Sequence, residues 1–357
     1  MRKNNLDIIA LIPGANFRRL FKCDFHLMER PLLVIIPIRG LPVAIIPFLE
    51  LDAFKKIQFE GEIFFWKDEI GYENAFEKAS KLIPKIRLNQ RFGVEGQRMR
   101  VFEQIALQKV FPDSQFIDAH KAISSIRLVK TDFEIKQLRQ AISISEIALQ
   151  ETLSTIKIGQ TEKQIETNLI KYLFAHGAQG LSFDPIVAAG KNSSKPHASA
   201  RYDYKIKKGD ALLIDFGATW NGYNADITRT FFVQEVSAYN EELYDTVLKA
   251  NKCGRVSCEP GCSAGKIDDR VQTILENSRF REFIRHKTGH GLGLDVHEDP
   301  QIMRSNHQII ERGMVFTIEP GLYRTEECGV RIEDNVVMTE AGVRCLTNFG
   351  RHLQIIP

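Results

Sequence analysis

The sequence lacks both the charge excess expected of a nucleic-acid-binding protein and the long apolar run expected of a membrane protein. Lys and Arg number 48 and Asp and Glu 45 among 357 residues, so the formal net charge is +3. So small an excess predicts neither a nucleic-acid surface nor an acidic partner. The apolar run near the N-terminus is too short for a signal peptide. The most apolar segment, residues 31–51, contains four prolines and an arginine, which favours two strands joined around Arg39-Gly40 over a membrane span.

Cysteine is also scarce, with six residues in the chain. In a protein of this length, six cysteines do not predict a disulfide scaffold. Cys253, Cys258 and Cys262 are close in sequence and could begin a metal or iron–sulfur site, but they lack a paired fourth ligand and straddle Pro260-Gly261. We therefore interpret them as buried or incidental thiols of a protein in the reducing cytoplasm.

The composition provides enough apolar sequence for two domains. The chain is 43% hydrophobic, and 357 residues suffice for two separate cores. Strand and helix signals alternate up to about residue 125, with helices expected near 72–83 and 99–110, which predicts an α/β domain over residues 1–127. A long amphipathic stretch begins near Thr131, where an acidic first turn is typical of a helix start. We place the second domain at residues 128–357.

The second domain carries an internal repeat. The segment GQTEKQIE (159–166) matches GCSAGKID (261–268), and each is predicted to begin a helix with its hydroxyl residue as the N-cap. The segment IKKGDALLIDFG (206–217) matches IERGMVFTIEPG (310–321). The offsets between the copies, 102 and 104 residues, agree closely. The sequence thus predicts two related halves that face each other.

Each half places two acidic residues among apolar ones. Asp215 ends one apolar run, and Glu319 holds the equivalent position in the second half. Asp226 and Glu333 come next, and the alternation of side chains along a strand turns both away from the core. Four converging carboxylates would repel one another and raise one another's pKa. Two divalent cations would balance this charge, so we predict a two-metal site.

Two histidines lie in one glycine-rich segment. KTGHGLGLDVHEDP (287–300) contains His290 and, seven residues later, His297. Its glycines argue against a helix and favour a backbone that approaches another group closely. No second histidine follows His297 at the spacing of a zinc-protease helix. We interpret the pair as one metal ligand and one catalytic partner.

These segments resemble the pita-bread metallopeptidases, specifically the Xaa-Pro branch of prolidases and aminopeptidase P. The resemblance covers residues 125–357 through IDFGATWNGYNADITRT, GHGLGLDVHEDP, IEPGLY and VRIEDN, and the N-terminal domain by position and size. It implies a creatinase-like α/β N-terminal domain and an α+β pita-bread catalytic domain with a pseudo-twofold repeat. It also implies five metal ligands, which are Asp215, Asp226, His290, Glu319 and Glu333.

The same resemblance implies a role for each ligand. Asp226 and Glu333 would bridge both metals, Asp215 would serve one metal, and the other two ligands would serve the second. His197 and His297 match the two histidines of the family that assist catalysis without binding metal. A site with one histidine and four carboxylates suits manganese or cobalt and also admits zinc.

A mechanism can be written for such a site. Two metals would share a water and lower its pKa towards neutrality, and the resulting hydroxide would attack the scissile carbonyl. Glu319 is the expected proton carrier, His297 the group that stabilises the oxyanion and His197 a substrate contact. Arg331 would neutralise surplus negative charge or also orient the substrate, and Phe183 would form a wall for the proline ring.

The leading hypothesis is a two-metal exopeptidase that hydrolyses Xaa-Pro bonds in small peptides. We favour a proline dipeptidase over an aminopeptidase P that acts on longer peptides, because the chain is compact. Methionine aminopeptidase shares the metal pattern but typically lacks the extra N-terminal domain. A creatinase-like, metal-free amidinohydrolase has the same layout without the five ligands. A catalytically inactive peptide-binding module is the alternative from another class, and such modules lose ligands that this chain keeps.

The chain also departs from the family in three places. Ala198 stands where relatives usually have glycine, one extra residue precedes Lys208, and the segment NFRRLFKC (16–23) lacks the Tyr-Leu-Thr-Gly-like stretch common in relatives. These changes leave the metal ligands in place and bear on the length of the substrate. Relatives pair through their N-terminal domains, so we also expect a homodimer, with the apolar hairpin at residues 31–48 as a surface for it.

Overall fold

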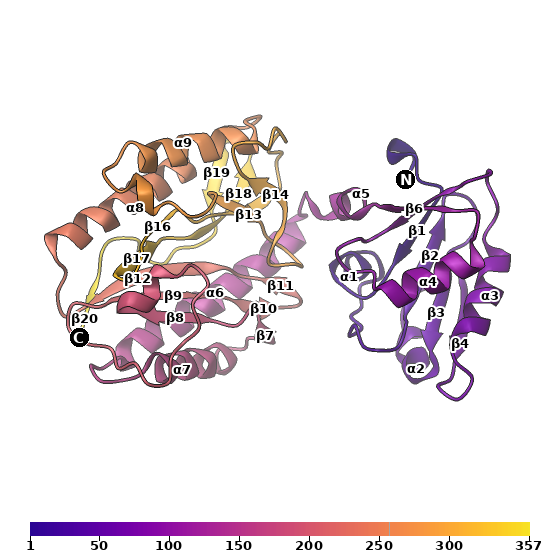
Figure 1. Cartoon of the computed structure of the whole chain (residues 1–357), viewed down its shortest axis with the longest axis horizontal. Coiled ribbons are helices and arrows are strands. Elements are labelled where there is room, and N and C mark those ends of the chain that lie inside the picture. The colour runs from indigo at the N-terminus through magenta and orange to yellow at the C-terminus, as the bar shows by residue number, and fades with distance from the viewer. Residues whose placement is uncertain (257) are drawn as a thin grey trace. The chain divides into compact units, whose positions relative to one another are not determined.

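The computed structural model describes residues 1–256 and 258–357. Within them the chain divides into two compact units, Met1–Arg127 and Leu128–Pro357 (Figure 1). Each unit has apolar cores of its own. In the part of the chain that the structure describes, no helix is long and apolar enough to cross a membrane.

The first unit is a six-stranded sheet with helices on both faces. Its strands are β1 (Ile8–Leu11), β2 (Leu33–Pro37), β3 (Val43–Pro47), β4 (Glu62–Trp66), β5 (Arg91–Val94) and β6 (Gln115–Asp118). Its helices are α1 (Ala15–Phe21), α2 (Leu51–Phe54), α3 (Glu73–Leu82), α4 (Val101–Val110) and α5 (His120–Ser124). The strand order is β4-β3-β2-β1-β5-β6, and the strands of β1–β2 and β2–β3 are antiparallel while the other pairs are parallel.

Alternation along the strands produces two cores in this unit. Ile45 of β3 packs in the cluster that contains α3 and α4, whereas its neighbours Ala44 and Ile46 pack in the cluster that contains α1 and α2. The predicted strand pair around Arg39-Gly40 is confirmed as β2 and β3, and the helices expected near 72–83 and 99–110 are confirmed as α3 and α4. β2 and β3 lie inside the sheet and are almost wholly buried, so only the turn and the end of this hairpin, at Leu41 and Phe48, expose apolar side chains. The use of the hairpin as a dimer surface stays a prediction.

The second unit encloses short sheets between two pairs of helices. Its helices are α6 (Asp132–Thr155), α7 (Glu162–Ala175), α8 (Ala238–Val256) and α9 (Ala264–Glu276). Its strands are β7 (Gly180–Leu181), β8 (Ile186–Ala189), β9 (Ala211–Phe216), β10 (Ala218–Trp220), β11 (Tyr223–Asn224), β12 (Ile227–Val233), β13 (Gly289–Gly291), β14 (Glu298–Ile302), β15 (Val315–Ile318), β16 (Gly321–Arg324), β17 (Cys328–Arg331), β18 (Asp334–Thr339), β19 (Gly342–Cys345) and β20 (Ile355–Ile356). They form the sheets β11-β10-β7, β20-β12-β9-β8, β14-β13-β15-β18-β19 and β16-β17. Figure 1 shows α6 and α7 on one side of these strands and α8 and α9 on the other.

The internal repeat is present in the structure of the second unit. α7 and α9 begin at the predicted N-caps, Thr161 and Ser263, whose side chains each accept a hydrogen bond from the backbone N–H three residues later. The two N-cap residues also form matching isolated bridges, one to Lys205 and the other to Ile309. β9 pairs antiparallel with β12, and β15 pairs antiparallel with β18. Each half thus supplies one helix pair and one strand pair of the same design.

The four acidic residues stand at equivalent ends of these strand pairs. Asp215 lies in β9, and Asp226 immediately precedes β12. Glu319 immediately follows β15, and Glu333 immediately precedes β18. Ile227, next to Asp226, is fully buried in the apolar core, as the alternation of side chains predicts. The repeat therefore brings two acids from each half to one place.

Candidate active site

Five residues with metal-binding groups converge between the two halves. They are Asp215, Asp226, His290, Glu319 and Glu333, and all except the half-buried Glu319 are buried. One donor atom from each of Asp215, Asp226 and Glu333 lies within 4.8 Å of the other two. The same limit holds for His290, Glu319 and Glu333, so Glu333 belongs to both groups. We call these five residues the carboxylate cluster.

Glycine is required on both sides of His290. A Cβ atom at Gly289 would lie 2.1 Å from the carbonyl oxygen of Thr317, and one at Gly291 would lie 2.2 Å from that of Asp299. No side chain fits at such distances, which confirms the expected close approach of this backbone. The backbone N–H of His290 donates to Thr317 Oγ1 at 3.1 Å, and this bond holds β13 in place.

The ring of His290 lies between two carboxylates. Its Nε2 is 3.2 Å from Oε1 of Glu319 and 3.6 Å from Oδ2 of Asp226. Its Nδ1 is 3.1 Å from the carbonyl oxygen of Gly291. A neutral ring that donates from Nδ1 to this carbonyl leaves the lone pair of Nε2 pointing into the cluster, and a ligand histidine has this tautomer.

Two carboxylate oxygens in the cluster are buried without a hydrogen-bond partner among the described residues. They are Oδ1 of Asp215 and Oε1 of Glu333. The other oxygen of each group is satisfied, since Arg331 donates to Asp215 Oδ2 and Thr228 Oγ1 donates to Glu333 Oε2 at 2.7 Å. A buried acceptor without a partner costs roughly 1–3 kcal/mol, and more when it is charged. Carboxylate oxygens without a hydrogen-bond partner can coordinate divalent cations, which prefer oxygen ligands. The residues present therefore fit metal ions.

Burial and mutual repulsion shift the acidities within the cluster. Burial raises the pKa of Asp226 well above its usual range, and the charges of Glu333 and Asp215 raise it further. The pKa of Glu333 is raised well above its usual range by burial and by the charges of Glu319 and Asp215. Burial also acts to raise the pKa of Glu319, but without a cation at Nε2 the hydrogen bond and charge of a protonated His290 outweigh it and lower this pKa to about 2. Without cations, the cluster therefore retains protons that metal binding must displace.

Arg331 provides positive charge next to the cluster. It precedes Glu333 by two residues, and its side chain points to the same side as that of Glu333, as strand alternation predicts. Its Nε donates to Thr228 Oγ1 at 3.0 Å, and one Nη donates to the hydroxyl of Tyr323 at 2.6 Å. The other Nη donates to Asp215. All three nitrogens thus bond to protein groups, and the residue is only 3% exposed. These contacts favour charge balance and orientation of Asp215 over direct contact with the substrate.

The two predicted helper histidines border the cluster. The ring of His297 lies edge-on to that of His290, with 4.2 Å between the ring centroids. Burial and the neighbouring His290 lower the pKa of His297 to about 4, so this ring is neutral at pH 7. His197 is exposed and follows Pro196, whose carbonyl accepts a hydrogen bond from Arg331 at 3.3 Å. The ring of His297 thus lies beside the cluster and the backbone before His197 is tied to it through Arg331, while the substrate contacts of both histidines stay a prediction.

Phe183 lies in the stretch between β7 and β8 and is half-buried. The preceding residue, Ser182, donates its backbone N–H to the carbonyl of Gly217 at 2.9 Å. Gly217 comes two residues after Asp215, so this stretch is held beside the end of β9. The role of Phe183 as a wall for the substrate stays a prediction.

Four further residues support the site and were not among those predicted from the sequence. They are Thr228, His286, Tyr323 and Asn335. The side chain of Asn335 accepts from the backbone N–H of Asp226 at 3.2 Å and donates to its carbonyl. Tyr323 links Arg331 to Nε2 of His286, which is 2.8 Å from its hydroxyl. Thr228 follows Asp226 by two residues on a strand, so alternation could have identified it. The other three act through partners distant in sequence, which no local pattern indicates.

Asn251 of α8 ties together the segments that carry the two glutamates. Its Nδ2 donates to the carbonyls of Ile318 and Ile332, each at 3.1 Å. These two residues immediately precede Glu319 and Glu333. Asn251 is fully buried, so one amide bridges the two segments from behind.

Comparison with known proteins identifies the family. Residues 136–340 match the family model described as metallopeptidase family M24, and residues 1–129 match the creatinase/prolidase N-terminal domain. The chain belongs to metallopeptidase family M24. The predictions of a creatinase-like N-terminal domain, a pita-bread catalytic domain and a metal-dependent peptidase are thereby confirmed.

Relatives cover most of this M24 peptidase. It is 33% identical over 279 residues to an Xaa-Pro dipeptidase of Pyrococcus furiosus, which is 78% of this chain and 79% of the relative. A crystal structure of a recombinant prolidase from Thermococcus sibiricus matches with a TM-score of 0.93 at 31% identity, over 99% of this chain and 96% of that one. An X-Pro aminopeptidase structure from Thermotoga maritima matches with a TM-score of 0.82 at 29% identity, over 98% of each chain.

Metal binding should release protons. Asp226 and Glu333 have raised pKa values in the metal-free enzyme, and carboxylates must be deprotonated to bind cations. Titration calorimetry of Mn²⁺ into the metal-free enzyme at about pH 7 should therefore give heats that differ between buffers of different ionisation enthalpy.

The sign of the accompanying stability change follows from linkage. A carboxyl whose pKa is raised on folding stabilises the metal-free fold at low pH, and this contribution is lost as the pH rises through the raised pKa. The stability gained on metal binding should therefore increase as the pH rises through that pKa. Identical calorimetric heats in all buffers would contradict this prediction.

Proposed function

We propose that this M24 peptidase is a proline dipeptidase that hydrolyses Xaa-Pro bonds with two divalent metal ions. The observation that carries the proposal is the pair of buried, unpartnered oxygens of Asp215 and Glu333 within a cluster of four acids and one histidine. The substrate class is supported by relatives named Xaa-Pro dipeptidase and prolidase. The substrates are small peptides with proline at the second position. We also propose the cytoplasm as its location, because all six cysteines are free.

We assign Asp226 and Glu333 as ligands of both ions. Glu333 belongs to both groups of three donors, and Asp226 lies close to Asp215 on one side and to His290 on the other. Asp215 would complete the ligands of one ion, and His290 with Glu319 those of the second. The set of one nitrogen and otherwise oxygen donors favours manganese or cobalt and also accepts zinc.

Bound there, the ions supply Lewis acidity, which lowers the pKa of a water molecule and polarises a carbonyl. Glu319 takes the proton of the attacking water and passes it to the leaving amine. His297 is neutral at pH 7 and donates an N–H to the carbonyl oxygen as negative charge develops there. His197 and Phe183 hold the substrate against the cluster. Arg331 balances the surplus negative charge.

Aminopeptidase P, which acts on longer Xaa-Pro-Yaa peptides, is the second candidate. It is favoured by the match to the Thermotoga maritima X-Pro aminopeptidase over 98% of each chain. The dipeptidase has the stronger support, because the Thermococcus sibiricus prolidase matches with the higher TM-score of 0.93. An inactive peptide-binding module is disfavoured, since the described residues keep all five metal-binding groups together.

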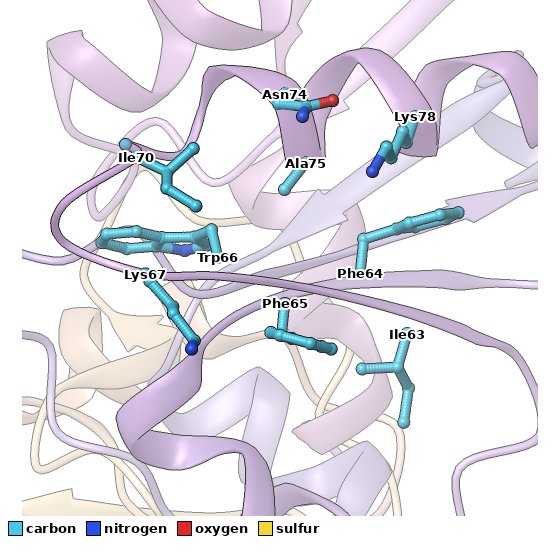
Figure 2. Close-up of a pocket in the computed structure, with 10 residues that line it drawn as sticks. Ile63, Phe64, Phe65, Trp66, Lys67, Ile70, Asn74, Ala75 and Lys78 are labelled. Carbon is cyan, nitrogen blue, oxygen red and sulfur yellow. The ribbon is translucent and has the colours of Figure 1, made fainter.

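We further propose that the enzyme forms a homodimer through the exposed edge of the first unit. β4 is the edge strand of the six-stranded sheet. Figure 2 shows Phe64 and Trp66 on the side of β4 that faces α3, whereas Ile63 and Phe65 point to the opposite side. Phe65 is 50% exposed and Ile70 is 72% exposed. Apolar side chains on an unpaired sheet edge favour association.

The dimer can be tested by light scattering. The parent should have twice the chain mass of 40.7 kDa, and Phe65→Glu and Ile70→Glu should shift it towards the monomer by burying charge in the interface. Leu88→Glu is a matched control, because Leu88 is 79% exposed and lies outside the groove beside β4. A monomeric parent across a concentration series would reject the dimer.

Substitution of the shared ligands should remove both metals. Asp226→Asn and Glu333→Gln each take a carboxylate from both ions, so elemental analysis should find most of both ions lost. Asp184→Asn is the matched control, since Asp184 is an exposed acid outside the cluster and should leave metal content unchanged. Full occupancy in either cluster variant would refute the shared assignment.

The helper histidines should affect turnover without affecting metal content. His197→Ala and His297→Ala should keep metal and lose about 100-fold or more in kcat/KM, the effect of removing an oxyanion or acid–base group. Arg331→Lys should also lose activity and keep both ions, because lysine cannot make the three directed contacts of the guanidinium. The exposed His307 provides a control, His307→Ala. Loss of metal from His297→Ala would make His297 a ligand instead.

The proposed activity predicts a ranking of peptides. Ala-Pro and Met-Pro should be cleaved at least about tenfold more efficiently than Ala-Ala, which is the discrimination that an apolar pocket gains from a few extra methylenes. Xaa-Pro-Yaa tripeptides should be cleaved more slowly than the dipeptides. Faster cleavage of tripeptides would move the assignment to aminopeptidase P, and equal rates on Ala-Ala would remove the preference for proline.

A further inference from the structure

Two cysteines of the second unit face each other outside the carboxylate cluster. Sγ of Cys258 and Sγ of Cys262 are 3.1 Å apart, and Cys258 is buried while Cys262 is half-buried. Over residues 1–256 and 258–357, neither thiol belongs to a group of three metal-binding side chains, so nothing supports an iron–sulfur site here. We propose that this thiol pair is an oxidation site, at which a peroxide joins Cys258 and Cys262 in a disulfide.

The local backbone brings the two thiols together. They begin and end the pentapeptide CEPGC, which lies before α9. The backbone N–H of Cys262 donates to the carbonyl of Glu259 at 3.0 Å, and Gly261 has a φ of 82°, so the chain turns tightly between the thiols. The carbonyl of Cys262 accepts from the N–H of Ile310 at 2.9 Å, which anchors this end of the turn. A disulfide needs a separation of about 2.05 Å, so the sulfur atoms need to close by only about 1 Å.

The surroundings of the two thiols differ, and the difference assigns their roles. The hydrogen bond from Cys258 and the charge of Arg270 lower the pKa of Cys262 to about 7, although partial burial opposes them. The same hydrogen bond, together with burial, raises the pKa of Cys258. Cys258 also packs in an apolar cluster with Phe316 and Ile318, whereas Cys262 is more exposed to solvent. Cys262 is therefore the nucleophile, and Cys258 is the thiol that resolves the intermediate.

The reaction balances with hydrogen peroxide as the oxidant. The thiolate of Cys262 attacks one peroxide oxygen, an S–O bond forms, the O–O bond breaks, and the hydroxide that leaves takes up a proton to give water. Sγ of Cys258 then attacks the sulfur of Cys262, the S–S bond forms and the S–O bond breaks. The proton of Cys258 leaves with that oxygen as a second water. Two thiols lose two electrons in total, and one peroxide gains them.

A third cysteine of the same region serves as the matched control. Cys253 lies in α8, and its Sγ is 3.8 Å from the carbonyl oxygen of Arg270. The 3.1 Å contact of the proposed pair joins Sγ of Cys258 to Sγ of Cys262. Cys253→Ser should therefore leave the oxidation unchanged, and neither this residue nor the pair belongs to the proposed catalytic machinery.

The experiment uses the reduced, metal-loaded, full-length enzyme and a small molar excess of hydrogen peroxide. Intact mass should fall by two hydrogen atoms, the peptide that spans Cys258 and Cys262 should resist alkylation, and dithiothreitol should reverse both changes. Cys258→Ser should instead stop at a sulfenic acid on Cys262, which dimedone traps. Cys262→Ser should give no disulfide and no dimedone adduct in this peptide. Serine is nearly isosteric with cysteine, and matching thermal melts check that both variants fold.

Three outcomes would overturn the proposal. One is a parent enzyme in which Cys262 is oxidised by peroxide but no S–S bond forms. Another is a disulfide that joins Cys253 or Cys345 in place of this pair. The third is faster alkylation of Cys258 than of Cys262 in the reduced enzyme, which would reverse the assigned roles. The readout is covalent mass, so it does not depend on whether Xaa-Pro peptides are the substrate.

Discussion

Repulsion among four converging carboxylates is the constraint on which the second unit depends. Asp215, Asp226, Glu319 and Glu333 meet at one place, and burial and mutual repulsion disfavour the charged states of Asp226 and Glu333 there. An apolar core could not hold such a group without compensation. One arginine and one histidine offset part of the negative charge. Two carboxylate oxygens have no hydrogen-bond partner among the described residues, and a cation could bind to them. The same carboxylates that repel one another are therefore the groups that fit a cation.

The repeat explains how one chain assembles such a group. Each half places one acid at the end of a strand and the other just before the partner strand. The half that contains β15 and β18 also supplies His290 through β13 and Arg331 through β17. The halves thus share a scaffold but differ in the charges they add to it. The site is therefore asymmetric although the scaffold is pseudo-symmetric. His290 places a nitrogen donor beside Glu319, and Arg331 places a guanidinium beside Asp215.

Local sequence patterns predict the strands, the helix starts and the positions of the acids. They do not predict contacts between residues that only the folded chain brings together. Period-two alternation placed the acids opposite the core, and the matched segments located the N-caps Thr161 and Ser263. The apolar run at 31–48 did not show by itself that β2 and β3 are central strands covered on both faces, because an exposed strand pair can have a similar composition. Asn335 and Tyr323 act on groups that only the folded chain brings near. The contact between Cys258 and Cys262 likewise depends on a turn that composition does not specify.

The amide of Asn251 constrains the spacing of two metal-binding side chains from outside the carboxylate cluster. Because this side chain joins the carbonyls just before Glu319 and Glu333, it helps to set the gap between those glutamates. A preset gap also penalises ions whose radius does not match it, since the fully buried amide cannot move without breaking two hydrogen bonds. Selectivity between metals of similar chemistry would then originate in a helix behind the site rather than in the ligands themselves.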